Sequence, residues 1–203
     1  MAARYDDYIE TLSSAIRAVE ATSSDGTGLT VDAAIEQIHR ILRGILNGPN
    51  KVMFVGNGGS AGIAGHMAID FAKNGGVRAI TFNDASSLTC LGNDLGYDQV
   101  FAKQVEMQGL GGDVLIAISS SGESKNILCA AEMAATKGCA VITLTGFSPG
   151  NALRRLGAVN FYVNSGVYGF VETAHQTILH AILDTGMGWS KATANVQPSR
   201  PLV

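Results

Sequence analysis

The chain has 203 residues, of which 46% are hydrophobic and only 15% are charged, and it contains 25 glycines. This composition is typical of one compact α/β domain with many tight turns and excludes a disordered or fibrous protein. The formal net charge is −3 and no cluster of Lys or Arg is present, so we expect neither nucleic acid nor a membrane as a partner.

The cysteines and the apolar runs indicate the cellular compartment of the protein. Cys90, Cys129 and Cys139 are odd in number and lack the spacing of a metal site, which favours a reducing compartment over a disulfide framework. No stretch reaches the roughly 18 apolar residues of a membrane-spanning helix, and the first residues lack the apolar core of a signal peptide. We therefore expect a cytoplasmic protein.

Two amphipathic helices are predicted at the start of the chain. Apolar residues recur at steps of three and four from Tyr5 to Val19 and again from Val31 to Ile45, on either side of a Ser/Gly-rich break at residues 23–28. We expect residues 1–48 to form a helical pair. Its apolar stripes could pack on the sheet of the same chain or on a second copy, and an oligomer interface is the preferred interpretation.

From residue 49 onward, short apolar runs alternate with helical stretches. This alternation predicts one domain over residues 49–189, a three-layer α/β/α fold with a five-stranded parallel sheet, followed by a loosely ordered tail at 190–203. The expected strands are residues 51–55, 78–82, 113–118, 140–145 and 159–163, and the expected helices are 60–74, 86–107 with a break near Gly96, 123–137, a short one near 150–156, and 168–189.

Two loops that follow predicted strands are suited to bind phosphate. One runs from Gly56 to Ser60 and the other from Ser119 to Ser124, and each leads into a predicted helix. Backbone N–H groups at a helix N-terminus, together with serine hydroxyls, favour an anion. The spacing matches neither a dinucleotide fingerprint nor a Walker loop, so a sugar phosphate is favoured over a nucleotide. Taken alone, the serine loop could equally be a turn with a helix cap.

Four side chains on the helices beside these loops could hold a metal ion. His66 and Asp70 are one turn apart on one helix, and Glu172 and His180 are two turns apart on the last helix. Two imidazoles and two carboxylates are ligands that suit Zn²⁺. The alternative is that each histidine is an ordinary core or interface residue.

The chain resembles a known family. Gly56-Asn57-Gly58-Gly59-Ser60, Gly92-Asn93-Asp94 and Ser119-Ser120-Ser121-Gly122-Glu123-Ser124 look, in this order, like the motifs of the SIS (sugar isomerase) domain, and specifically of its phosphoheptose isomerase branch. The resemblance extends from about Lys51 to Leu183. It implies a flavodoxin-like fold and a homotetramer with sites at subunit interfaces.

The resemblance also implies roles for individual residues. It places Asp70 and His180 in proton transfer and one Zn²⁺ per subunit on His66, Asp70, Glu172 and His180. The residues implied to bind substrate are Asn57, Gly58, Gly59, Ser60, Asn93, Asp94, Ser119, Ser120, Ser121, Ser124 and Glu172.

The implied reaction converts sedoheptulose 7-phosphate into D-glycero-D-manno-heptose 7-phosphate through a cis-enediol, in heptose biosynthesis for lipopolysaccharide or a related carbohydrate. Three departures from the family leave the substrate open: Asp70 stands where Glu is expected, Glu172 stands where Gln is common, and the segment 73–77 is short. One alternative is an isomerase for another substrate, such as an octose phosphate. The other is a non-catalytic sugar-phosphate-binding module that acts through a protein partner.

Overall fold

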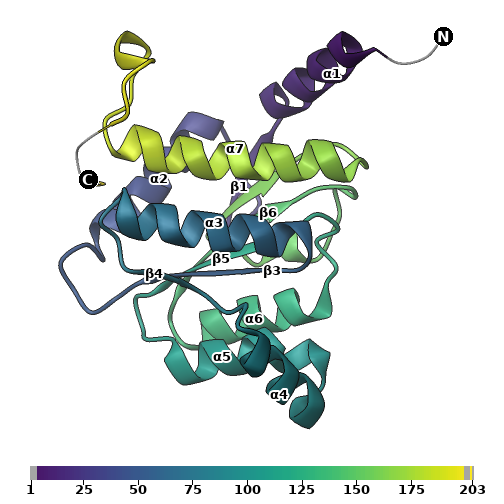
Figure 1. The fold of residues 1–203 in the computed structure, drawn as a ribbon, viewed down its shortest axis with the longest axis vertical. Coiled ribbons are helices and arrows are strands. Elements are labelled where there is room, and N and C mark those ends of the chain that lie inside the picture. Colours follow the sequence, from purple (N-terminus) through teal and green to yellow (C-terminus); the bar gives the residue numbers. More distant parts are fainter. Residues whose placement is uncertain (1–3, 199–201, 203) are drawn as a thin grey trace.

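The fold is a three-layer α/β/α arrangement around one mostly parallel sheet (Figure 1). The computed structural model describes residues 4–198 and 202. The sheet order is β2-β1-β7-β6-β5-β3-β4. Its five parallel strands, which confirm the prediction for this part, are β3 (Val52–Gly56), β4 (Ala79–Thr81), β5 (Val114–Ser119), β6 (Ala140–Thr145) and β7 (Val159–Tyr162).

The whole sheet has seven strands, so the predicted count of five is corrected. The two additional strands, β1 (Glu20–Ser23) and β2 (Gly28–Leu29), form an antiparallel hairpin in the region expected to be a break, and β1 pairs with β7. Both strands are short and partly polar, and β1 is held by pairing with a strand that lies far away in the sequence. A local pattern carries no signal for such a pairing.

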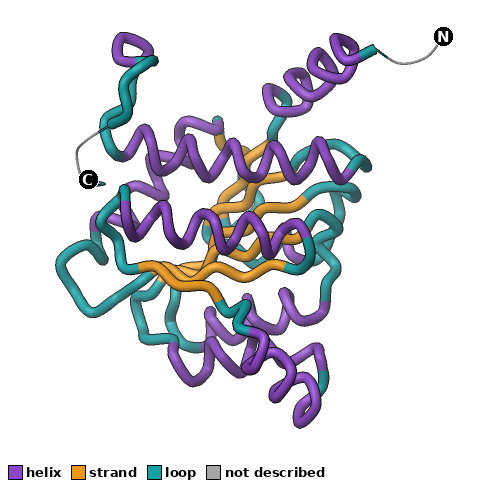
Figure 2. Tube along the Cα trace, viewed as in Figure 1, coloured by secondary structure: helices purple, strands orange, loops and turns teal. Residues whose placement is uncertain are grey.

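Helices cover both faces of the sheet (Figures 1 and 2). Three of them, α2 (Val31–Arg43), α3 (Gly59–Lys73) and α7 (Tyr168–Gly186), pack on one face, and the apolar stripe of α2 is buried there against its own chain. The other face carries α5 (Val100–Gln108) and α6 (Lys125–Thr136), with α4 (Ala85–Leu95) beside them. Because neighbouring strand residues face opposite cores, as Phe54 and Met53 do, the central strands are continuously apolar.

The helix breaks fall where the sequence indicates. Gly96 has a φ of 85°, a conformation that favours glycine, and it separates α4 from the one-turn helix Tyr97–Gln99 and from α5. The short helix expected near residues 150–156 is a single turn at Leu153–Arg155.

The first helix, α1 (Tyr5–Arg17), projects from the body and buries none of its residues (Figure 1). It contacts the start of α7, where the rings of Tyr8 and Phe170 lie 4.7 Å apart. Ile9, Leu12 and Ile16 line a shallow hollow along its side. The intersubunit role of the N-terminal helices stays a prediction.

The end of the chain returns to the body. Leu202 is fully buried, and its N–H donates to the carbonyl of Gly75 at 3.0 Å. One helical turn at Lys191–Thr193 lies in the segment expected to be a loose tail, of which residues 199–201 and 203 lie outside the described residues. Within the described part of the chain, no helix combines the length and the apolar character needed to cross a membrane.

Candidate active site

The two predicted anion-binding loops meet in one pocket. Strands β3 and β5 are neighbours in the sheet, and from there the strand order runs outward to β4 on one side and to β6 and β7 on the other. Their carboxyl ends therefore form the switch point at which ligands bind in open α/β sheets. The pocket has a volume of about 240 Å³ and is lined by Asn57, Gly58, Gly59, Ser60, Ile118, Ser119, Ser120, Ser121, Ser124, Tyr168 and Glu172.

The serine loop is organised by its own hydroxyls. The N–H of Gly122 donates to Ser119 Oγ at 3.1 Å, and Ser119 Oγ lies 3.3 Å from Ser124 Oγ. Ser121 Oγ accepts the N–H of Glu123 at 3.2 Å. Ser120 Oγ is buried and has no hydrogen-bond partner among the described residues. A buried hydroxyl without a partner is costly, so a ligand oxygen at this position would satisfy it.

Gly122 is required by the shape of this loop. Its φ is 66°, and a Cβ at this position would collide with the side chain of Asn151. Asn151 is buried and donates from Nδ2 to the carbonyl of Ser148 at 2.8 Å, while its Oδ1 accepts the N–H of Arg154. The loop after β6 therefore packs against the serine loop through Asn151. No local motif indicated this role of Asn151.

The features of the pocket that would favour an anion do not include a basic side chain. Its lining contains no Lys or Arg, and Lys125 points to solvent with its ammonium 3.9 Å from Asp98. The positive potential comes instead from the N-termini of α3 and α6, which both open at the pocket. At the start of α3 the Glu172 carboxylate packs directly on Gly59, where any Cβ would collide with it. The serine loop at α6 is therefore the free anion position.

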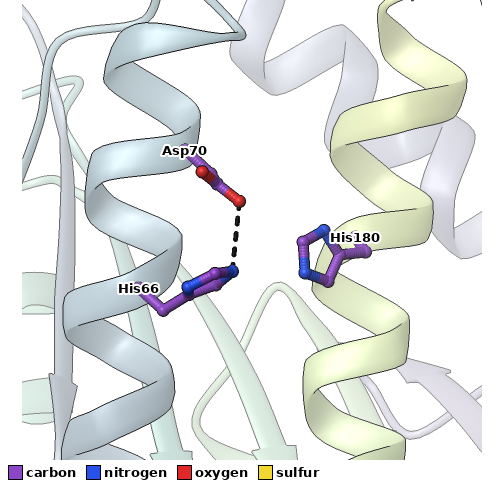
Figure 3. A group of neighbouring side chains, drawn as sticks. All are labelled: His66, Asp70 and His180. Carbon is purple, nitrogen blue, oxygen red and sulfur yellow. Dashed lines mark ion pairs between the residues drawn. The ribbon is translucent and has the colours of Figure 1, made fainter. Parts of the chain in front are cut away.

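A second group of polar side chains lies further along the same two helices (Figure 3). His66 and Asp70 of α3 point toward His180 of α7, and one ligand atom from each of the three lies within 4.8 Å of the others. His66 Nε2 is 3.2 Å from Asp70 Oδ2, and the rings of His66 and His180 are 5.4 Å apart. Two imidazoles and a carboxylate at this separation fit Zn²⁺.

Neighbouring polar groups orient this cluster. Gln176 Nε2 lies 3.0 Å from His180 Nε2 and donates to Met67 Sδ at 3.3 Å, and Asn74 Nδ2 donates to Asp70 Oδ1 at 3.3 Å. Burial raises the pKa of Asp184, one turn beyond His180, and the nearby charge of Asp70 adds to this effect while His180 opposes it. Gln176 was not expected at the site, because the helix spacing alone does not show which side chains meet.

Three predicted site residues lie outside one or both of these groups. Glu172 lines the pocket of the two loops and is not part of the His66, Asp70 and His180 cluster, because two helical turns separate it from His180. Asn93 and Asp94 are exposed on α4, hydrogen bonded to each other, and do not line the pocket. The structure thus brings together the two loops and, separately, three of the four predicted metal ligands.

Comparison with known proteins identifies the family of the chain. A model of the SIS domain matches residues 7–146, more than half of the chain. The chain belongs to the SIS domain family. Among curated SIS-domain relatives, a phosphoheptose isomerase from Colwellia psychrerythraea is 36% identical over 159 residues, 74% of this chain and 81% of the relative. Another from Shewanella frigidimarina is 33% identical over 187 residues, 88% of this chain and 90% of the relative.

The SIS fold is also seen in solved structures. A phosphoheptose isomerase from Neisseria gonorrhoeae superposes with a TM-score of 0.75 at 30% identity, over 89% of this chain and 95% of that chain. Together with the curated relatives, this structure places the chain in the phosphoheptose isomerase branch of the SIS domain family, as its three motifs predicted.

Proposed function

We propose that the protein is a phosphoheptose isomerase that interconverts sedoheptulose 7-phosphate and D-glycero-D-manno-heptose 7-phosphate. The observation that carries the proposal is the separation of two subsites along α3 and α7, the serine pocket and the His66, Asp70 and His180 cluster. Eight residues of helix separate Glu172 from His180, about 12 Å. An open-chain heptose phosphate has its phosphate and its carbonyl at opposite ends and suits this arrangement.

The phosphate end is assigned to the serine loop. Ser119, Ser120, Ser121 and Ser124 would hold the phosphate oxygens at the start of α6, as helix N-termini do. Asn57, Gly58, Gly59 and Ser60 would hold sugar hydroxyls, and Glu172 would accept a hydrogen bond from one of them. Asn93 and Asp94 remain proposed substrate ligands, and α4 would have to present them to the sugar.

The carbonyl end is assigned to Asp70 and His180. In this proposal the Asp70 carboxylate takes a proton from C1 of the ketose, exchanges it with solvent while the enediol is bound, and delivers a proton to C2, which gives the aldose without net loss of a proton. His180 donates a proton to the carbonyl oxygen at C2 and accepts one from the hydroxyl at C1, through the cis-enediol. The demands are a base over the carbon-bound hydrogen and an acid beside the oxygen.

The residues at this end also fit a metal ion. We propose His66, Asp70 and His180 as the ligands of one Zn²⁺ per subunit, whereas Glu172, two turns away, serves the substrate. When bound, the ion would polarise the oxygens of the substrate. The two imidazoles and the carboxylate already converge without it, so binding would need little rearrangement.

The assembly is proposed to be a homotetramer with its sites at subunit interfaces. The His66 side chain is 52% exposed in the single chain, and α1 has no buried residue. A second copy would cover both. We propose a cytoplasmic location, in keeping with three free thiols.

The test is a turnover assay of the purified, metal-analysed protein on sedoheptulose 7-phosphate and on an octulose 8-phosphate. The proposal predicts conversion of the heptulose phosphate and loss of activity on chelation, with recovery on addition of Zn²⁺. Conversion of the octulose phosphate alone would replace the substrate. Binding of both sugars without conversion would support the binding module.

A further inference from the structure

Two asparagine side chains join the two loops of the phosphate pocket. Asn57 Nδ2 donates to Asn126 Oδ1, and Asn126 Nδ2 donates to Asn57 Oδ1, both at 2.9 Å. Asn57 follows β3, and Asn126 lies in the first turn of α6, directly after the serine loop. The pair therefore connects the entries of α3 and α6, the two helices whose N-termini face the pocket.

A third side chain completes the contact. Tyr97, in the one-turn helix between α4 and α5, donates its hydroxyl to Asn57 Oδ1 at 3.2 Å. Asn57 Oδ1 thus accepts two hydrogen bonds from the protein, and one of its two N–H groups is used by Asn126. A carbonyl oxygen has two lone pairs and an amide nitrogen has two hydrogens. Asn57 therefore offers a ligand a single N–H donor in a fixed direction.

The burial of Asn126 makes its hydrogen bonds to Asn57 necessary. Asn126 is 3% exposed and does not line the pocket, so it reaches a ligand only through Asn57. If Asn57 is removed, Asn126 keeps buried polar atoms without partners, which is costly. If Asn126 is removed, the half-buried Asn57 keeps only the hydrogen bond from Tyr97 and is freer to rotate. Tyr97, by contrast, is 59% exposed, so loss of its hydroxyl would change Asn57 and leave the packing in place.

We infer that Asn126 and Tyr97 are positioning residues that fix Asn57 as a hydrogen-bond donor to the sugar phosphate and hold the two loops at one separation. This inference rests on the proposed function for the identity of the ligand. It adds two residues, neither of which touches the substrate, to those that determine affinity.

The test is a double-mutant cycle on Asn57→Ala and Asn126→Ala, measured as KM and kcat for sedoheptulose 7-phosphate and as the Kd of the same sugar phosphate by calorimetry. Each single variant is expected to raise KM and Kd about five- to tenfold, the effect of one lost hydrogen bond. The double variant should be no worse than Asn57→Ala, because Asn126 acts through Asn57. Tyr97→Phe should raise KM about two- to fivefold with unchanged kcat and unchanged melting temperature.

Asn160→Ala is the matched control. Asn160 is also buried and accepts a hydrogen bond from Thr143 in the sheet, so its loss should lower the melting temperature and leave KM unchanged. Multiplicative effects in the double variant, or an unchanged KM in Tyr97→Phe, would overturn the inference, and Tyr97→Phe decides if Asn126→Ala does not fold. Binding of sedoheptulose 7-phosphate without turnover would remove the proposed reaction and leave the cycle valid, whereas no binding of it would remove both.

Discussion

At the residue scale, the proposed phosphate pocket offers hydroxyls and helix ends instead of lysine or arginine. Each serine then carries a larger share of the affinity than it would beside a guanidinium, because no formal positive charge compensates for its loss. This makes single hydroxyl deletions informative.

Ser121→Ala should weaken binding of the sugar phosphate. A hydrogen bond to a charged group is worth about 1.5 to 3 kcal/mol, so KM should rise roughly ten- to a hundredfold while kcat changes little. Steady-state kinetics measure this effect. Ser86→Ala, an exposed serine on α4 outside the pocket, is the control and should behave as wild type. An unchanged KM in Ser121→Ala would remove the phosphate assignment.

Asp70→Asn should abolish turnover, because an amide cannot take a proton from carbon. General base catalysis contributes about 10² to 10⁴-fold, so kcat should fall by at least this factor while the melting temperature stays close to that of the wild type. Asp70→Glu lengthens the side chain by one methylene and should retain part of the activity. Glu106→Gln, an exposed carboxylate on α5, is the control. Full activity of Asp70→Asn would show that another group is the base.

The sequence motifs predicted much of this candidate site, and the spacing of residues along a helix predicted less of it. The serine loop, Asn57 and the cluster of His66, Asp70 and His180 follow from motifs and from the one-turn spacing of two of them. Glu172 lies two turns from His180 in a different subsite. Asn126, Tyr97 and Asn151 were missed because their roles depend on contacts between segments far apart in the chain.

At the scale of elements, α7 connects the site to the core through a buried histidine. His175 is fully buried, and its Nε2 donates to the carbonyl of Thr145, whereas Nδ1 has no partner among the described residues. Burial lowers the pKa of His175 to about 4, an effect that the hydrogen bond to Thr145 only partly offsets. The packing between α7 and β6 therefore requires that the His175 ring is neutral.

This predicts a pH dependence of stability. The unfolded chain binds a proton on His175 below a pH of about 6.5 and the folded chain does so only near pH 4, so stability is complete above pH 6.5 and falls as the pH decreases between these values. The loss amounts to about 3 kcal/mol. Denaturant unfolding from pH 7 to 4 should show a flatter dependence for His175→Gln. Parallel curves for the two proteins would contradict the buried neutral histidine.

A buried ion pair joins β3 and β5 at their amino ends, which lie away from the pocket. Lys51 Nζ lies 2.6 Å from Asp113 Oδ2, and Asp113 also accepts the backbone N–H groups of Lys51 and Leu110. Burial alone would raise the pKa of Asp113, but these hydrogen bonds and the one from Asn50 outweigh it and hold this pKa below the usual value. The pair fixes the strands from which both anion-binding loops start.

Asp113→Asn should therefore destabilise the fold without changing the chemistry. Removal of one partner leaves Lys51 buried without a counter-charge, which costs about 3 to 5 kcal/mol. Because the pKa of Asp113 is depressed, its contribution is present above a pH of about 4 and is lost as the pH falls further. Chemical denaturation should show a large difference from wild type at pH 7. Equal stability there would contradict the account.

Elements with a strong local signal were predicted well. The central strands and the helices that flank them are apolar at the right period, and the break at Gly96 was visible in the sequence. The hairpin of β1 and β2 was missed because its residues become strands only by pairing with β7.

At the scale of the whole molecule, the unburied α1 is the feature that a single chain does not explain. Tyr5, Tyr8 and Ile9 are 77%, 44% and 42% exposed. Such side chains in water are unfavourable, and a second copy is the partner that we propose for them.

Ile9→Glu should disrupt the assembly by placing a charge in this apolar surface. We expect the wild type to sediment at four times the mass of the chain, and Ile9→Glu to sediment as a smaller species with reduced activity. Met107→Glu changes another exposed apolar residue, on α5, and should leave the mass unchanged. A monomeric wild type would contradict the proposed tetramer.

The central claim is that Asp70 and His180 move a proton between adjacent carbons of a sugar phosphate that is held by the serine loop. The most direct test follows sedoheptulose 7-phosphate in D₂O by NMR with the wild type and with Asp70→Asn. The account predicts an aldose product with deuterium at the carbon next to the carbonyl for the wild type, and neither product nor exchange for Asp70→Asn. Product without deuterium, or exchange that persists in Asp70→Asn, would contradict it.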